Sequence, residues 1–145
     1  MMSLRLDQTD YTIGWVCALP SEFAAAVAAL DERHPPILHR SAADDNTYQF
    51  GRVGHHNIVI ACLPSGAYGI TSAAIVATKL QQSFQSIKLG LMVGIGGGAP
   101  ILPHNDIRLG DVIVSEPGPE HITNTRYRQI TMVTHRLVLA TPLSP

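Results

Sequence analysis

A cluster of glycines at the end of an apolar run constrains the fold of this chain more than any other feature. The apolar residues Leu89–Val93 lead directly into Gly-Ile-Gly-Gly-Gly at positions 94–98, and a second apolar run, Val112–Ser115, follows a Leu-Gly-Asp turn. Glycines at the end of a buried strand let the backbone approach a ligand closely, because no Cβ stands in the way. In an open α/β sheet, ligands bind outside the carboxyl ends of the strands. The cluster therefore predicts a small-molecule site at a strand end.

Composition excludes several other classes of protein. The 145 residues correspond to about one domain, and 46% hydrophobic with 14% charged residues are typical of a folded globular chain. The formal net charge of -1 gives no electrostatic attraction to nucleic acid or to an anionic membrane. The histidines are scattered, and no spacing of His, Cys, Asp or Glu indicates a metal site. We therefore expect a small-molecule partner, with no nucleic acid, membrane or metal.

The cysteines and the N-terminus indicate the compartment. Cys17 and Cys62 each lie within an apolar run, which predicts two buried free thiols, although the sequence alone also allows a disulfide. Asp7 and Asp10 precede the first apolar run, unlike the basic start of a signal peptide. No apolar run is long enough to span a bilayer. The predicted localisation is cytoplasmic.

Strands and helices are expected to alternate through most of the chain. Phe23, Val27 and Leu30 recur at helical spacing after Pro20, a residue that the first turn of a helix tolerates. The predicted strands cover residues 11–18, 47–53, 58–63, 89–93 and 112–115, and the predicted helices cover 21–30 and, capped by Thr71 or Ser72, 73–84. This alternation predicts an α/β domain with a largely parallel core sheet. Residues 130–140 could add a strand, but they do not continue the alternation.

The glycine cluster also matches the dinucleotide-binding pattern G-x-G-x-x-A over residues 94–99. That pattern needs a helix to start at once, because the pyrophosphate sits on the helix N-terminus. Here Pro100 and Pro103 follow, and no helical period appears. A dinucleotide-binding domain is therefore disfavoured. A helix that starts at Gly98 in the structure would favour that interpretation again.

Three polar residues near strand ends are candidates for chemistry. Glu22 stands in the first turn of a helix directly after a buried strand. It either complements the helix dipole or serves as a base at the ligand edge of the sheet, and residue identities alone leave both roles open. Ser65 is favoured as a turn or cap residue, and Asp111 as a residue that hydrogen-bonds its own turn.

Three segments, taken in order, resemble the nucleoside phosphorylase and nucleosidase superfamily. Residues 13–22 resemble the opening strand and helix of the methylthioadenosine/S-adenosylhomocysteine (MTA/SAH) nucleosidases, and residues 64–74 are similar to the Ser-Gly-x-Gly turn and helix of that family. The third segment is Val-Gly-Ile-Gly-Gly-Gly at 93–98 together with residues 109–115. The amino-acid sequence of the first and third segments resembles a fungal branch of this superfamily more closely still. In that branch, such domains often stand at the N-terminus of multidomain proteins.

The resemblance implies a three-layer α/β/α nucleoside phosphorylase-like fold with a central mixed sheet, present here as a truncated form. Residues 11–116 would form the N-terminal portion of that domain, and residues 117–145 a divergent tail outside the family pattern. Nothing in that tail resembles the later half of the family, which supplies the acid that protonates the base and the residues that grip the ribose.

The implied chemistry is N-glycosidic cleavage of purine nucleosides or nucleotides, with Glu22 matching the glutamate that activates water. The substrate-binding residues carried over by the resemblance are Ala18, Leu19, Ser65, Gly66, Gly94, Ile95, Gly96 and Gly97. No cofactor is implied, and phosphate would be a co-substrate only in a phosphorylase. Arg52 and Arg108 fall in no matching arginine motif, which together with Glu22 favours hydrolysis.

Two departures from the family lead to a second hypothesis. Ile95 stands where the nucleosidases carry a serine, and the later half of the family has no counterpart. We therefore expect weak or lost activity, since a positioned acid contributes about 10²–10⁴-fold. The alternative is a non-catalytic module for nucleoside sensing or interaction. Half a sheet would leave an open edge, which favours a homo-oligomer.

Overall fold

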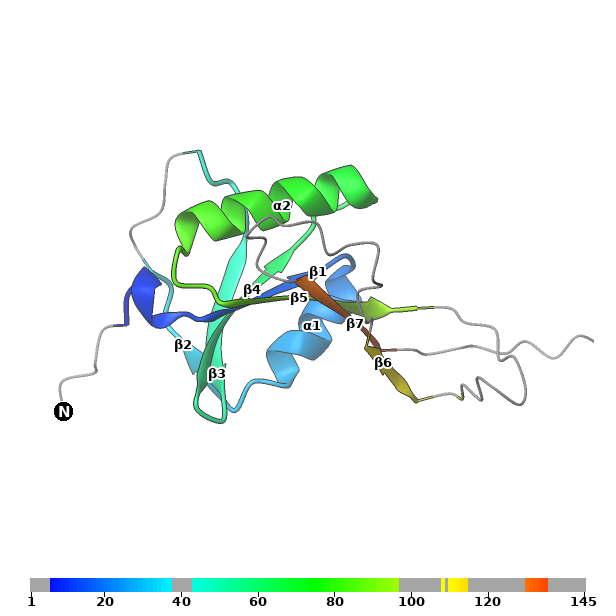
Figure 1. Cartoon of the computed structure of the whole chain (residues 1–145), viewed down its shortest axis with the longest axis horizontal. Coiled ribbons are helices and arrows are strands. Elements are labelled where there is room, and N and C mark those ends of the chain that lie inside the picture. The colour runs from blue at the N-terminus through cyan, green and yellow to red at the C-terminus, as the bar shows by residue number, and fades with distance from the viewer. Residues whose placement is uncertain (1–5, 38–42, 97–107, 109, 115–129, 136–145) are drawn as a thin grey trace, which may run out of the picture.

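The computed structural model describes residues 6–37, 43–96, 108, 110–114 and 130–135, and these form one mixed sheet with a helix on each face (Figure 1). The strands are β1 (Ile13–Cys17), β2 (Glu32–His34), β3 (Tyr48–Val53), β4 (His56–Cys62), β5 (Leu89–Ile95), β6 (Val112–Val114) and β7 (Ile130–His135). The helices are α1 (Pro20–Ala28) and α2 (Ile70–Ser83), preceded by the short 3-10 helix η1 (Gln8–Asp10). The order in the sheet is β2-β3-β4-β1-β5-β7-β6.

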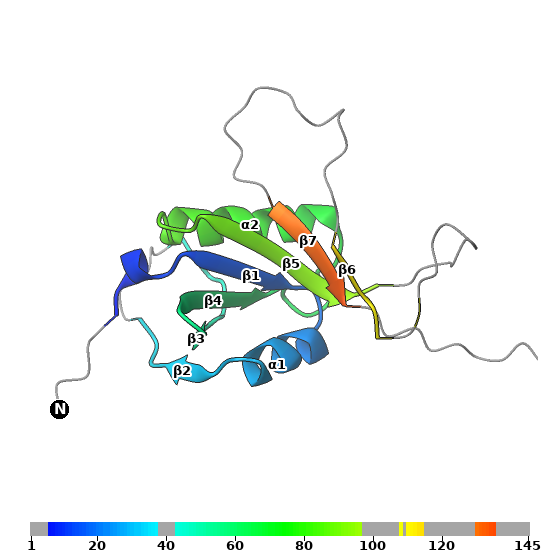
Figure 2. The same ribbon diagram turned by 60° about the horizontal axis from the view of Figure 1, so that its bottom comes forward.

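Strand β1 lies at the centre and pairs in parallel with β4 on one side and with β5 on the other. Strand β7 continues the parallel set beyond β5, whereas β2, β3 and β6 pair with their neighbours in the antiparallel sense. Figure 2 shows β1, β4, β5 and β7 running in the same direction. The carboxyl ends of these strands therefore share one edge of the sheet.

Helix α1 covers one face of the sheet, where the side chains of alternate residues of β1 and β4 point. Cys17, Ala26, Ile58 and Ile60 form its buried core, and the partly buried residues packed on them include Trp15, Phe23, Val27 and Leu30. The packing of Phe23 and Val27 confirms their predicted helical spacing, whereas the predicted helix 21–30 is too long: α1 ends at Ala28, and Leu30 packs on this core from beyond the helix. A single apolar stripe is enough to attach a nine-residue helix to a sheet.

Helix α2 covers the opposite face over a larger core. The buried aromatic rings of Tyr11, Phe50 and Phe84 meet edge to face or tilted, with centroids 5.2–6.1 Å apart. Val76 and Leu80 of the helix are buried against this cluster, as their spacing predicted. A buried polar residue, Asn46, fixes the preceding loop to the helix, since its side-chain amide donates to the Val76 carbonyl at 3.1 Å and to the Tyr48 hydroxyl at 2.9 Å.

The predicted strands 11–18, 47–53, 58–63, 89–93 and 112–115 and the hairpin between β3 and β4 are confirmed in their described residues. The predicted start of the second helix is wrong: α2 begins at Ile70, and its N-cap is Gly69 rather than Thr71 or Ser72. The physical reason is the backbone of Gly69, whose φ of 101° is open to glycine and strained for other residues. Strand β2 was not predicted, because its three residues carry no periodic pattern.

The far side of β5 is not an open edge, contrary to the expectation from half a sheet. Strand β7, which lies in the predicted tail 117–145, pairs with β5 along six residues, and β6 pairs with β7. The outermost strands β2 and β6 have three residues each, and β6 pairs with β7 along Val133, Thr134 and His135. Within the described part of the chain, no helix is long and apolar enough to cross a membrane.

Burial of two acidic groups predicts a loss of stability at alkaline pH. Burial raises the pKa of the Cys17 thiol from 9.0 to about 12 and that of the Tyr11 hydroxyl from 10.0 to about 12. The unfolded chain loses these protons first, so the free energy of unfolding should fall as the pH rises from about 9 towards 12. Urea unfolding at several pH values should show a shallower decline in Cys17→Ala and Tyr11→Phe. Tyr68→Phe, at an exposed tyrosine, is the control, and equal slopes in all four proteins would contradict this assignment.

Candidate functional site

The candidate site lies at the shared carboxyl edge of β1, β4 and β5, and Glu22 is its central charged residue. Glu22 occupies the third position of α1, directly after the turn that leaves β1. Pro20 begins this helix, as its fixed φ allows, and places the Glu22 side chain back over the helix N-terminus. From there the carboxylate reaches both the β1–α1 turn and the end of β5.

Three backbone amides hold the Glu22 carboxylate. Its Oε2 accepts hydrogen bonds from the N–H groups of Ala18 and Leu19, each at 3.0 Å. Its Oε1 accepts one from the N–H of Ile95 at 2.8 Å, across 73 residues of sequence. Hydrogen bonds to an ionised acceptor are stronger than neutral ones, so this side chain ties the ends of two parallel strands together.

The two carboxylate oxygens of Glu22 are not equivalent. An ionised carboxylate oxygen has about two acceptor positions, and Oε2 uses both on the amides of Ala18 and Leu19. Oε1 uses one on the amide of Ile95, and no further hydrogen bond to it is found among the described residues. One acceptor position on Oε1, at the edge where the strands end, is therefore not used by any described residue.

The other predicted binding residues lie on the same edge with fewer contacts. Ser65 and Gly66 follow β4 and are exposed, and Gly66 has a φ of 82°, which explains the glycine there. Gly94 is the second-last residue of β5, and Gly96 directly follows the strand. Gly97 lies outside the described residues, and so does the position at Gly98 where we expect no helix to start. The structure thus joins Ala18, Leu19 and Ile95 to Glu22, whereas no hydrogen bond within the described residues joins Ser65 or Gly66 to it.

Exposed apolar side chains surround this edge. Leu19 after β1 is 38% exposed and Ile95 at the end of β5 is 51% exposed. Tyr68 and Ile70, between β4 and the first turn of α2, are 56% and 90% exposed. Sequence reasoning did not single out Tyr68 and Ile70, although their place in the segment after Ser65 could have indicated them. In these segments, exposed apolar side chains therefore accompany the Glu22 carboxylate.

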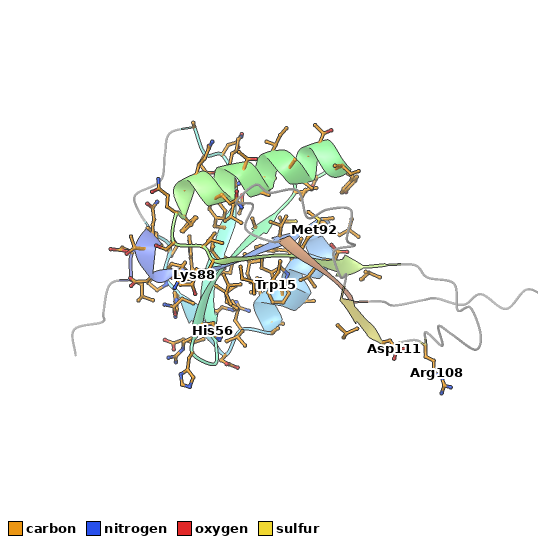
Figure 3. The ribbon with its side chains drawn as sticks, in the orientation of Figure 1. Trp15, His56, Lys88, Met92, Arg108 and Asp111 are labelled. Carbon is orange, nitrogen blue, oxygen red and sulfur yellow. The ribbon has the colours of Figure 1, made fainter. Side chains whose placement is uncertain are left out.

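Other candidates lie elsewhere or serve local structure. His56 and Lys88 stand at the amino ends of β4 and β5, away from the carboxyl edge (Figure 3). The Asp111 carboxylate accepts a hydrogen bond from the Arg108 amide at 2.8 Å, which confirms its predicted role within its own turn. Among the described residues, no group of three His, Cys, Asp or Glu side chains could hold a metal ion.

The two thiols next to the site are poor nucleophiles. Cys17 and Cys62 are register partners at the ends of β1 and β4, and both are free, with Cys17 buried and Cys62 partly buried. Burial raises the pKa of both thiols, that of Cys17 to about 12. Because the thiolate is the reactive form, neither residue is prepared for nucleophilic attack at neutral pH.

The sheet order and the two covering helices define the class: the chain has a three-layer α/β/α fold of the nucleoside phosphorylase-like type. Among solved structures, it is similar to the MTA/SAH nucleosidase of Colwellia psychrerythraea 34H in complex with adenine, with a TM-score of 0.53 and 20% identity over 72% of this chain. It is also similar to the Neisseria meningitidis nucleosidase in complex with methylthio-immucillin-A, with a TM-score of 0.52 and 16% identity over 71%. The chain covers 38% and 39% of these two proteins, and the predicted fold is confirmed over that part.

No family model matches the chain. A curated relative is a nucleotide-binding leucine-rich repeat (NLR)-like protein of Hyaloscypha variabilis (strain UAMH 11265 / GT02V1 / F). It is 48% identical over 111 residues, which are 77% of this chain but 11% of that much longer protein. The predicted resemblance to a fungal multidomain branch is consistent with this relative.

Removal of the Glu22 carboxylate should loosen both strand ends at once. In Glu22→Ala, the amides of Ala18, Leu19 and Ile95 lose their acceptor, so their hydrogen exchange should accelerate, by about tenfold or more if each bond contributes 1.5–3 kcal/mol. Exchange measured by NMR on the labelled chain tests this, with the Leu63 amide, which binds the Cys17 carbonyl, as the internal control. Unchanged exchange at Ile95 would show that the long-range bond does not form in solution.

Proposed function

We propose that this chain forms the water-activating part of a site that cleaves the N-glycosidic bond of purine nucleosides or nucleotides. The observation that carries the proposal is the position of Glu22, whose carboxylate is held at the carboxyl edge of the parallel strands with one acceptor position on Oε1 that no described residue uses. The shared fold with nucleosidases that were solved with adenine or a nucleoside analogue supports a purine ligand.

The proposed reaction is hydrolysis. A water molecule donates a hydrogen bond to Oε1 of Glu22 and attacks C1′ of the ribose as the C–N bond to the base breaks. The bonding electrons leave with the base nitrogen, which takes up a proton from solvent. The water proton passes to the Glu22 carboxylate, which returns it to solvent. The products are the free base and ribose, or the 5′-substituted ribose where the substrate carries a 5′ group. The negative charge of Glu22 favours neutral water over a phosphate anion as the nucleophile in this position.

The apolar side chains around Glu22 suit the rest of such a ligand. Binding sites for small molecules combine mostly apolar walls with a few polar groups that fix orientation. Leu19, Tyr68 and Ile95 would provide apolar contact for a purine or a 5′ substituent, and Ser65 and Gly66 would offer polar contacts from the segment after β4. Gly96 and Gly97 would let the backbone approach the ribose.

A second candidate function is nucleoside sensing without turnover. The similarity to an NLR-like protein, of which this chain matches 11%, favours a module that binds a ligand on behalf of a larger polypeptide. Such a module needs the binding edge but no complete set of acid and base groups. Binding without release of base separates it from the enzymatic function.

The test is to incubate the chain with adenosine, inosine, methylthioadenosine or ATP, with and without phosphate, and to measure free base by chromatography. Slow release is expected, because Glu22 is the one acid–base group that the described residues allow us to assign. Glu22→Gln keeps the shape and the acceptor oxygen but loses the charge, so release should fall by about 10²–10⁴-fold.

The outcomes separate the two functions. Release that Glu22→Gln leaves unchanged would refute the role of Glu22. Saturable binding of a purine nucleoside, measured by calorimetry, without detectable release would support the sensing module instead. Asp111→Asn, which alters a carboxylate in its own turn, is the control and should leave release unchanged.

A further inference from the structure

We propose that Gly94 is a positioning residue for Glu22, because its missing side chain leaves the space in which the carboxylate reaches the Ile95 amide. Glycine in a strand interior weakens the strand and needs a reason. Backbone conformation is not that reason, since Gly94 is absent from the glycines with positive φ, which among the described residues are Gly54, Gly66, Gly69 and Gly110. The consequence for activity rests on the proposed function, whereas the contact itself does not.

The space at Gly94 belongs to the Glu22 carboxylate. A Cβ placed on Gly94 would lie 2.8 Å from Oε1 of Glu22 and 3.2 Å from both its Cδ and its Oε2. These separations are shorter than a normal contact between a carbon atom and its neighbours, so one of the two groups must move. The three nearest atoms all belong to the Glu22 side chain, and a side-chain end moves more easily than the backbone of a paired strand.

The direction of that movement follows from the hydrogen bonds. Oε1 is the atom nearest to the added carbon and is also the acceptor of the Ile95 amide. Oε2 is held by the amides of Ala18 and Leu19, on the side of the β1–α1 turn. An alanine at 94 therefore separates Oε1 from the Ile95 amide and leaves the carboxylate attached to the β1–α1 turn alone. The fold is kept, but the acceptor position at the edge is displaced.

Gly14 provides a matched control in the neighbouring strand β1. A Cβ placed there would lie 2.9 Å from Cδ2 of Leu80 and 3.0 Å from Cδ1 of Ile87, again the ends of side chains, but in the core under α2. Gly14→Ala and Gly94→Ala thus introduce the same atom at nearly the same distance, and only the second meets Glu22. Any general effect of crowding the sheet should appear in both.

The experiment follows the Ile95 amide by NMR in the 145-residue chain. In Gly94→Ala, the Ile95 amide proton should move upfield and exchange about tenfold faster or more, as expected for loss of a hydrogen bond to a charged group, while the Ala18 and Leu19 amides stay protected. In Gly14→Ala, all three amides should be unchanged. An Ile95 amide that is unaffected by Gly94→Ala would overturn the proposal.

A double-mutant cycle gives an independent readout, also if Gly94→Ala alone folds poorly. Gly94→Ala should lower the free energy of unfolding in the wild-type chain. In the Glu22→Ala background, where the carboxylate is gone, the same substitution should lower it much less. An equal loss in both backgrounds would contradict the proposed contact. If base release is measurable, Gly94→Ala should lower kcat more than it changes KM and should add nothing to Glu22→Gln. Failure of base release alone would refute the proposed function and leave the NMR and stability results to decide the role of Gly94.

Discussion

The parallel pairing of β1 with β4 and β5 is the constraint on which the rest of the structure depends. Because these three strands run the same way, their last residues and the segments that follow meet at one edge. Parallel strands need crossover connections, which here include helices α1 and α2 on opposite faces of the sheet. The direction of these strands therefore brings the segments of the candidate site together, and the side chains act within that arrangement.

Glu22 adds a second constraint to that topology. A ladder of backbone hydrogen bonds holds β1 and β5 side by side, but it stops where the strands end. Beyond that point the carboxylate joins the Leu19 and Ile95 amides and extends the connection by one side chain. Glycine at 94 makes room for it, since any Cβ there would meet Oε1. The Glu22 side chain from helix α1 and the glycine in β5 therefore form one local unit.

Much of this arrangement could be predicted from the sequence, and the failures have physical causes. Periodicity located β1, the β3–β4 hairpin, β5 and both helices, because each carries an apolar pattern of at least five residues or clear turn residues. It missed β2, whose three residues pair with β3 without a pattern, and it placed the start of α2 too late, because a glycine cap has no side chain to recognise. The partners of Glu22 could not be read from spacing, since the Ile95 amide lies 73 residues away. The family resemblance supplied the candidate residues, but only the three-dimensional structure shows that Gly94 lies against the Glu22 carboxylate.

The hydrogen bonds of Glu22 bear on whether it caps a helix or acts as a base. A capping glutamate at this position of a helix needs only the amide of the N-cap residue, here Leu19, and a glutamine can do the same. The bond to Ile95 is not required by the helix, because it leads to another strand. It directs Oε1 towards the edge of the sheet, and proton acceptance there requires the charge that glutamine lacks. Capping explains why an acceptor stands at position 22, and the bond to β5 explains where its second oxygen points. The capping role and the proposed role as a base therefore use different oxygens of one carboxylate and do not compete.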